Sequence, residues 1–71
     1  MNKIIRISDI VDVNIELPFN IRICRNELQS ILLTFESAEK VMKAMESIES
    51  QLNGINSLTG KNEYLTIENI L

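Results

Sequence analysis

The chain has 71 residues, 45% of them hydrophobic and 24% charged, and its formal net charge is −3. This composition is typical of a globular domain and excludes a disordered chain, and the acidic balance argues against a nucleic-acid-binding surface. With one cysteine and no histidine, an intrachain disulfide, the common zinc sites and the Ser–His–Asp and Cys–His catalytic arrangements are excluded.

Polar and apolar residues alternate in the first half of the chain, as they do in half-buried antiparallel strands. The pattern predicts short strands over 3–7 and 19–24 and a longer strand over 10–17, and Pro18 in "LPFN" indicates a turn. The apolar faces consist of Val11, Val13, Ile15 and Leu17 in the longer strand and of Phe19, Ile21 and Ile23 in the next one.

Residues 28–35, "LQSILLTF", have the fewest polar side chains and predict a central strand with both faces at least partly covered. One face carries Ile31, Leu33 and Phe35, and the opposite face carries Leu28 and Leu32.

The stretch that follows has the period of an amphipathic helix, with Ser37 as N-cap and Asn53–Gly54 as the stop. Its apolar stripe consists of Val41, Met45, Ile48 and Leu52. Met42 flanks the stripe, and the methionines would suit an adaptable partner-binding groove. We favour packing of the stripe on the chain's own sheet, because the alternating strands need a helix to cover them.

Two stretches resemble ligand-binding motifs only in part. "GINSLTGKN" (54–62) has too many residues between its glycines for a phosphate-binding loop and follows a helix, so we predict an ordinary loop. "DVNIEL" (12–17) has oxygen-bearing side chains at alternate positions but lacks the glycine of a calcium loop. The last strand is predicted over 63–71, where the core-facing residues are Leu65 and Ile67, with Leu71 as a further candidate.

These elements predict one α+β domain over residues 1–71. A small, mostly antiparallel sheet of four to five strands consists of a β-meander and, after the helix, a last strand, with the helix on one face. One helix cannot cover both faces, so apolar side chains such as Leu28 and Leu32 are expected to remain on the other face or on an edge strand, as an interaction surface. Because a core this small supplies only about 3–5 kcal/mol, we also expect a homo-oligomer.

The leading functional hypothesis is a small non-enzymatic binding protein that blocks or sequesters a macromolecular partner through Leu28, Leu32 and Met42. In size and composition the chain looks like the inhibitors of host defence, such as anti-CRISPR proteins, that phages and mobile elements encode. No cofactor, metal or membrane contact is expected. The N-terminal "MNKIIRISD" lacks the apolar segment of an export signal, which with the single cysteine predicts a cytoplasmic protein.

Two other classes of function stay open. Arg6, Arg22 and Arg25 would hold an anionic, nucleotide-type ligand if the fold or an interface between copies brought them together, which would make the protein an oligomeric sponge. Cys24 is interpreted as a half-buried structural residue. The remaining class is a structural or assembly subunit that self-associates through the same apolar surface.

Overall fold

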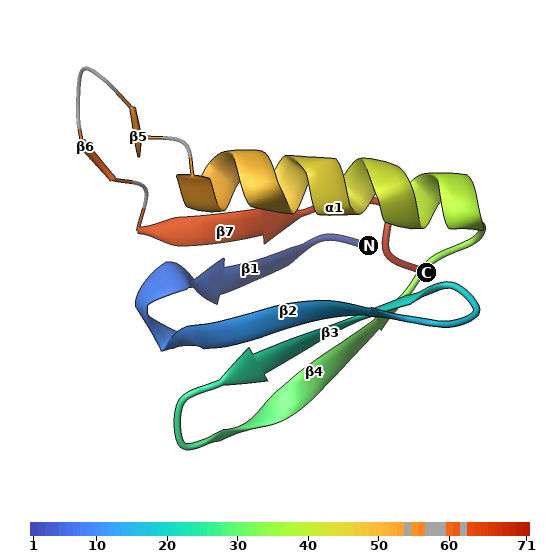
Figure 1. Cartoon of the computed structure of the whole chain (residues 1–71), viewed down its shortest axis with the longest axis horizontal. Helices are drawn as coiled ribbons and strands as arrows, with labels where there is room; N and C mark the ends of the chain where they lie inside the picture. The colour runs from blue at the N-terminus through green and yellow to red at the C-terminus, as the bar shows by residue number, and fades with distance from the viewer. Residues whose placement is uncertain (54, 57–59, 62) are drawn as a thin grey trace.

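The computed structural model describes residues 1–53, 55–56, 60–61 and 63–71, and it shows an α+β fold (Figure 1). The helix α1 lies alongside the short strand β7, and β1 lies on the other side of β7. In chain order the elements are β1 (Lys3–Arg6), the short 3-10 turn η1 (Ile7–Asp9), β2 (Ile10–Glu16), β3 (Asn20–Arg25), β4 (Leu28–Thr34), α1 (Ala38–Asn53), β5 (Ile55–Asn56), β6 (Gly60–Lys61) and β7 (Tyr64–Ile67).

The strands are antiparallel throughout the described chain. β2, β3 and β4 form a meander in which Ile21 lies opposite both Ile15 and Leu33. β1 pairs with β7 over the full length of both strands, and β5 pairs with β6 within the segment predicted as a loop, the rest of which lies outside the described residues. The predicted α+β class, with a meander, one helix and a last strand, is confirmed. The prediction that residues 28–35 form a central strand is wrong, because β4 is an edge strand of the meander and β3 is the central one. The last strand returns to the first strand of the chain and leaves the meander as a separate sheet.

One cluster of buried apolar side chains lies between α1, which contacts β7 and β3, and the strands that it covers. Ile21, Ile23 and Leu65 have no exposed surface at all. The full cluster consists of Ile5, Ile21, Ile23, Leu33, Phe35, Val41, Ala44, Ile48, Leu65, Ile67 and Ile70. Because β3, β4, β1 and β7 all contribute side chains, a single core joins the two sheets.

The helix begins where the sequence predicts. The hydroxyl oxygen of Ser37 accepts a hydrogen bond from the Lys40 N–H at 3.3 Å, which satisfies one of the free N–H groups of the first turn. The buried residues of the helix are Val41, Ala44 and Ile48. Of the rest of the predicted stripe, Met45 is half-buried against the core and Leu52 is 37% exposed.

A β-bulge interrupts the alternation of β2. Val11 has no partner in β3, since Ile10 lies opposite Arg25 and the next pair is Asp12 with Cys24. The extra residue shifts the alternation by one position, so Ile10 packs against the core and Val11 is 62% exposed. The prediction that Val11 shares the core-facing side of this strand is therefore wrong.

A backbone turn at Asn69 changes the alternation after β7. Asn69 has a φ of 64°, a conformation that asparagine adopts more readily than most residues. Ile70 is consequently buried, whereas Leu71, the further candidate for the core, is 66% exposed. The Ile70 N–H donates to the Met1 carbonyl and the Leu71 N–H to the Thr34 carbonyl, each at 2.9 Å, which fixes the C-terminal residues against β1 and β4.

The face of the β2–β4 sheet that is turned away from the helix is mainly polar. By strand alternation it carries Asp12, Asn14, Glu16, Asn20, Arg22, Cys24, Ser30, Leu32 and Thr34. Leu32 is 48% exposed there, and the side chain of Leu28 lies outside the described part of the chain. Of the two places predicted for surplus apolar surface, the edge strand is the one that has it, since Val11 and Ile15 of β2 are exposed.

Candidate functional site

Two grooves follow the two flanks of α1, on either side of its buried residues. The flank that carries Lys40 and Gln51 faces β7 and the chain after it, and the flank that carries Met45 and Leu52 faces η1 and β2. A period of 3.6 residues places these two sets on opposite sides of the helix. We call the spaces the polar groove and the apolar groove.

The apolar groove has a volume of about 450 Å³ and follows α1 from Met45 to Asn53. Ile48, which is 1% exposed, belongs to the core, and Val11 and Leu52 are the most exposed of the apolar lining residues. The apolar lining consists of Ile7, Ile10, Val11, Val13, Met45, Ile48 and Leu52. An occupant would therefore be held mainly by apolar contacts.

The charged residues of the apolar groove, within the described part of the chain, are both acidic: Glu49 on α1, and Asp12 at the edge of β2, whose carboxylate is turned toward Asn14 on the outer face of the sheet. The Asp12 carboxylate accepts hydrogen bonds from the Val13 N–H and from the Asn14 side-chain amide, each at 2.9 Å. Because the Val13 N–H donates to a side chain and not to β3, it lies on the free edge of β2. Asp12 thus satisfies a backbone group that would otherwise be open to a neighbouring strand.

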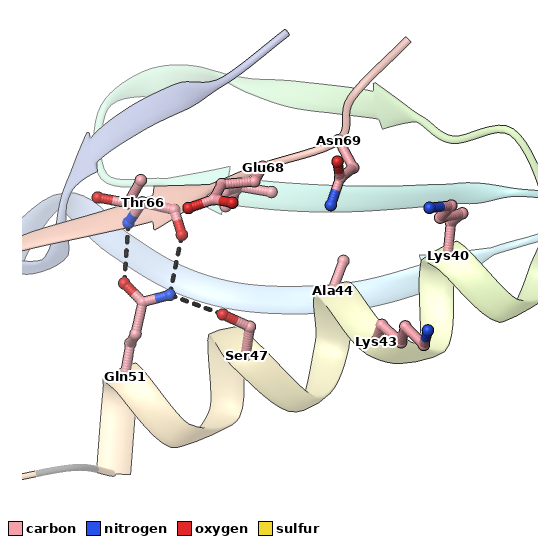
Figure 2. Close-up of a pocket in the computed structure, with 9 residues that line it drawn as sticks. Lys40, Lys43, Ala44, Ser47, Gln51, Thr66, Glu68 and Asn69 are labelled. Carbon is pink, nitrogen blue, oxygen red and sulfur yellow. Dashed lines mark hydrogen bonds between the residues drawn. The ribbon is translucent and has the colours of Figure 1, made fainter.

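The polar groove has a volume of about 530 Å³ and lies between α1 and the residues from Thr66 to Asn69 (Figure 2). The Gln51 side-chain oxygen accepts the Thr66 N–H at 2.9 Å, and its nitrogen donates to the Thr66 carbonyl at 2.8 Å and to the Ser47 hydroxyl at 3.0 Å. The charged residues of the lining are Lys40, Lys43 and Glu68.

Gln51 occupies the free edge of β7 in the way that a neighbouring strand would. The Ile7 N–H donates to the Glu63 carbonyl at 2.9 Å, and the alternation of an antiparallel pair then directs both backbone groups of Thr66 away from β1. The Gln51 side-chain amide bonds to both of these groups, donating to the Thr66 carbonyl and accepting from the Thr66 N–H. A second strand would have to displace Gln51 before it could pair with β7 at this point.

Arg6 and Arg25, predicted as parts of an anion site, are held by different partners. The Arg6 guanidinium carbon lies 5.4 Å from the centre of the Tyr64 ring, and Arg6 donates to the Tyr64 hydroxyl at 3.3 Å. Arg25 donates two hydrogen bonds, at 3.1 and 2.9 Å, to the carbonyl of Gln29 near the start of β4. Arg6 belongs to the β1–β7 pair and Arg25 to the β2–β4 sheet.

Arg22 forms an ion pair with Glu16 on the outer face of the β2–β4 sheet. The hydrogen bond to Glu16, and the attraction of its charge, raise the pKa of the Arg22 guanidinium above its ordinary value. A raised folded-state pKa stabilises the fold below the unfolded pKa, and that contribution is lost only as the pH rises through the folded value, far above neutral. Glu16 thus balances the charge of Arg22, and an anion site built from the three arginines stays a prediction for an interface between copies.

The described apolar residues that the sequence predicted as partner contacts lie on two different surfaces, the outer sheet face and the helix. Leu32 belongs to β4 and lies on the outer face of the sheet, away from both grooves. Met42 is 58% exposed, and its position one turn before Met45 places it on the apolar-groove flank of α1. Cys24 is half-buried, as a structural cysteine would be.

Within the described ranges, no group of three or more acidic or cysteine side chains could hold a metal ion. No helix in those ranges has both the length and the apolar character needed to cross a membrane. The comparisons with known proteins give no match to a family model, a curated protein or a solved structure.

The sequence interpretation raised a methionine-lined partner groove only as the alternative to packing on the sheet, and it missed the polar groove. Its stripe assigned Leu52 to the core, and it gave Gln51 no role. The spacing of Met42, Met45 and Leu52 did indicate a flank that is apolar beyond the buried residues, which was the available signal for the apolar groove. No comparable signal identified Gln51, because its role depends on which strand lies beside it.

Proposed function

We propose that this protein is a small protein-binding module whose apolar groove receives a segment of a partner and thereby blocks or sequesters that partner. The observation that supports the proposal is an open groove of about 450 Å³ with mainly apolar lining. Contiguous exposed apolar surface on a small domain typically marks an interaction site. An inhibitor encoded by a phage or mobile element, the class suggested by size and composition, would act by this kind of steric occupation.

Other parts of the surface are less suited to such a contact. The outer face of the β2–β4 sheet presents isolated Leu32 among polar groups. The polar groove is bordered by lysines and by the Gln51 contact with Thr66. Apolar anchors surrounded by a polar rim are the feature from which most interfaces derive their binding energy, and the apolar groove provides this arrangement.

The test compares two leucines that are exposed to a similar extent. Leu52→Asp places a charge at the apolar groove, where the side chain is 37% exposed, and Leu32→Asp places the same charge on the outer face, where it is 48% exposed. Each variant is purified from the cells that encode the protein, after circular dichroism has shown that it is folded, and its stoichiometric partner is quantified.

We expect Leu52→Asp to weaken the complex by more than about tenfold, the scale of a buried anchor, and Leu32→Asp to leave it unchanged. Loss of the partner only in Leu32→Asp would assign binding to the outer face and refute the proposal. A wild-type dimer in sedimentation, dissociated by Leu52→Asp, would show that the groove serves self-association instead.

A further inference from the structure

Resting on the proposed function, we infer that the apolar groove takes a protein segment in which two or three apolar side chains are flanked by lysine or arginine. The first ground is the sign of the charges at the groove. Both charged residues in its described lining, Asp12 and Glu49, are acidic. A cleft bordered by charges of one sign attracts ligands of the opposite sign and raises their rate of association.

The acidic and basic side chains of α1 are likewise divided between its two flanks. Glu49 lines the apolar groove, whereas Lys40 and Lys43 line the polar groove on the opposite flank. The lysines therefore do not neutralise the acidic rim. The chain as a whole carries a net charge of −3, which reinforces the preference for a basic partner.

The same charges disfavour a second copy of the chain as the occupant. In a twofold dimer each groove would face the equivalent surface of its partner, so the two copies of Glu49 would approach one another. Juxtaposed like charges in an interface oppose association. A segment with lysine or arginine beside its apolar anchors would instead form an ion pair with Glu49.

The segment would be recognised by its side chains and not as an added strand. Strand addition needs free backbone groups at the sheet edge, and the Asp12 carboxylate already accepts the Val13 N–H at 2.9 Å. From Met45 to Asn53 the groove is about 12 Å long at 1.5 Å per residue, equal to about two turns of a helix. That length accommodates two or three apolar anchors.

A displayed library of random linear peptides, selected on the wild-type chain, identifies the preferred occupant. We expect the selected peptides to be enriched in lysine and arginine next to apolar residues. The tightest of them should shift the amide resonances of Val11, Val13 and Leu52 in a two-dimensional NMR titration, and its affinity should fall as salt is added, because rim charges are screened.

Two charge-reversal substitutions, one at each groove, provide a matched test and control. Glu49→Lys reverses a charge at the apolar groove, and Glu68→Lys reverses one at the polar groove; both glutamates are exposed. For the selected peptide we expect Glu49→Lys to weaken binding about three- to tenfold, the scale of a rim ion pair that becomes a repulsion. Glu68→Lys should change the affinity less than about twofold, because its charge lies on the other flank.

The outcomes separate this inference from the proposed function. Peptides that map to the groove but lack basic residues, or that bind Glu49→Lys as tightly as the wild type, would overturn the inference and leave the groove as a binding surface. Peptides that leave the groove resonances unshifted, or resonances there that shift with protein concentration alone, would overturn both.

Discussion

Replacement of Gln51 by alanine removes the two hydrogen bonds that satisfy the free edge of β7. The side-chain amide accepts the Thr66 N–H at 2.9 Å and donates to the Thr66 carbonyl at 2.8 Å. A net contribution of about 1 kcal/mol for each bond gives an expected loss of about 2 kcal/mol in the free energy of unfolding. Alanine is the better helix former by a few tenths of a kcal/mol, about 0.3, so the measured loss is a lower bound on the hydrogen-bond contribution.

This loss is large for so small a domain. A chain of this length has a total stability of about 4–10 kcal/mol, and a loss of about 2 kcal/mol increases the unfolded fraction about 30-fold. The melting temperature should fall by about 8–16 °C, given about 4–8 °C per kcal/mol for domains of this size.

Urea denaturation followed by circular dichroism measures the change, with the midpoint expected to fall while the slope m stays constant. Hydrogen exchange of the Thr66 amide provides a local measurement, since that N–H loses its partner in Gln51→Ala. The matched control is Ser47→Ala, which removes only the bond that Gln51 donates at 3.0 Å and leaves the edge of β7 satisfied. If the two variants unfold within about 0.5 kcal/mol of each other and the Thr66 amide exchanges equally in both, the edge is not held by Gln51.

Two further pairs of substitutions test the core and a strained turn. Ile48→Ala, at a side chain that is 1% exposed, should cost about 2–5 kcal/mol and lower the midpoint of thermal unfolding. Met42→Ala, at 58% exposure on the same helix, should cost less than about 0.5 kcal/mol. Equal losses would contradict the assignment of Ile48 to the core. Glu27 has a φ of 53° between β3 and β4, so Glu27→Gly should raise the stability by about 0.5–1 kcal/mol in calorimetry, and Glu27→Val should lower it.

The helix and the meander were predictable because their signals are local. Ser37 has the side chain of a good N-cap, and the period of the apolar residues that follow fixes the buried side of α1. The strand over 19–24 places Ile21 and Ile23 in the core, as its alternation predicts. In each case a few neighbouring residues contain the whole pattern.

The features that the sequence did not predict depend on single backbone angles or on distant partners. Val11 and Asn69 each shift an alternation by one residue, and neither the bulge nor the positive φ follows from the residue type alone. The pairing of β1 with β7 joins the two ends of the chain, so no local pattern encodes it. The role of Gln51 follows from that pairing, because only the pairing makes Thr66 an edge residue.

The free edges of β2 and β7 are both protected by side chains, so that this small domain can expose apolar surface beside them. Asp12 satisfies an edge group of its own strand β2, and Gln51 of α1 satisfies edge groups of β7, so the apolar groove can stay open with less risk of sheet-to-sheet association. Ile48 belongs both to the core and to the lining of that groove, which couples occupation of the groove to the stability of the fold. A ligand that binds only the folded state, present at a free concentration of 100 times its dissociation constant, raises the free energy of unfolding by about 2.7 kcal/mol. A core of this size supplies only about 3–5 kcal/mol on its own. The partner segment would thereby provide the support that disulfides, metals or further subunits give to other small domains.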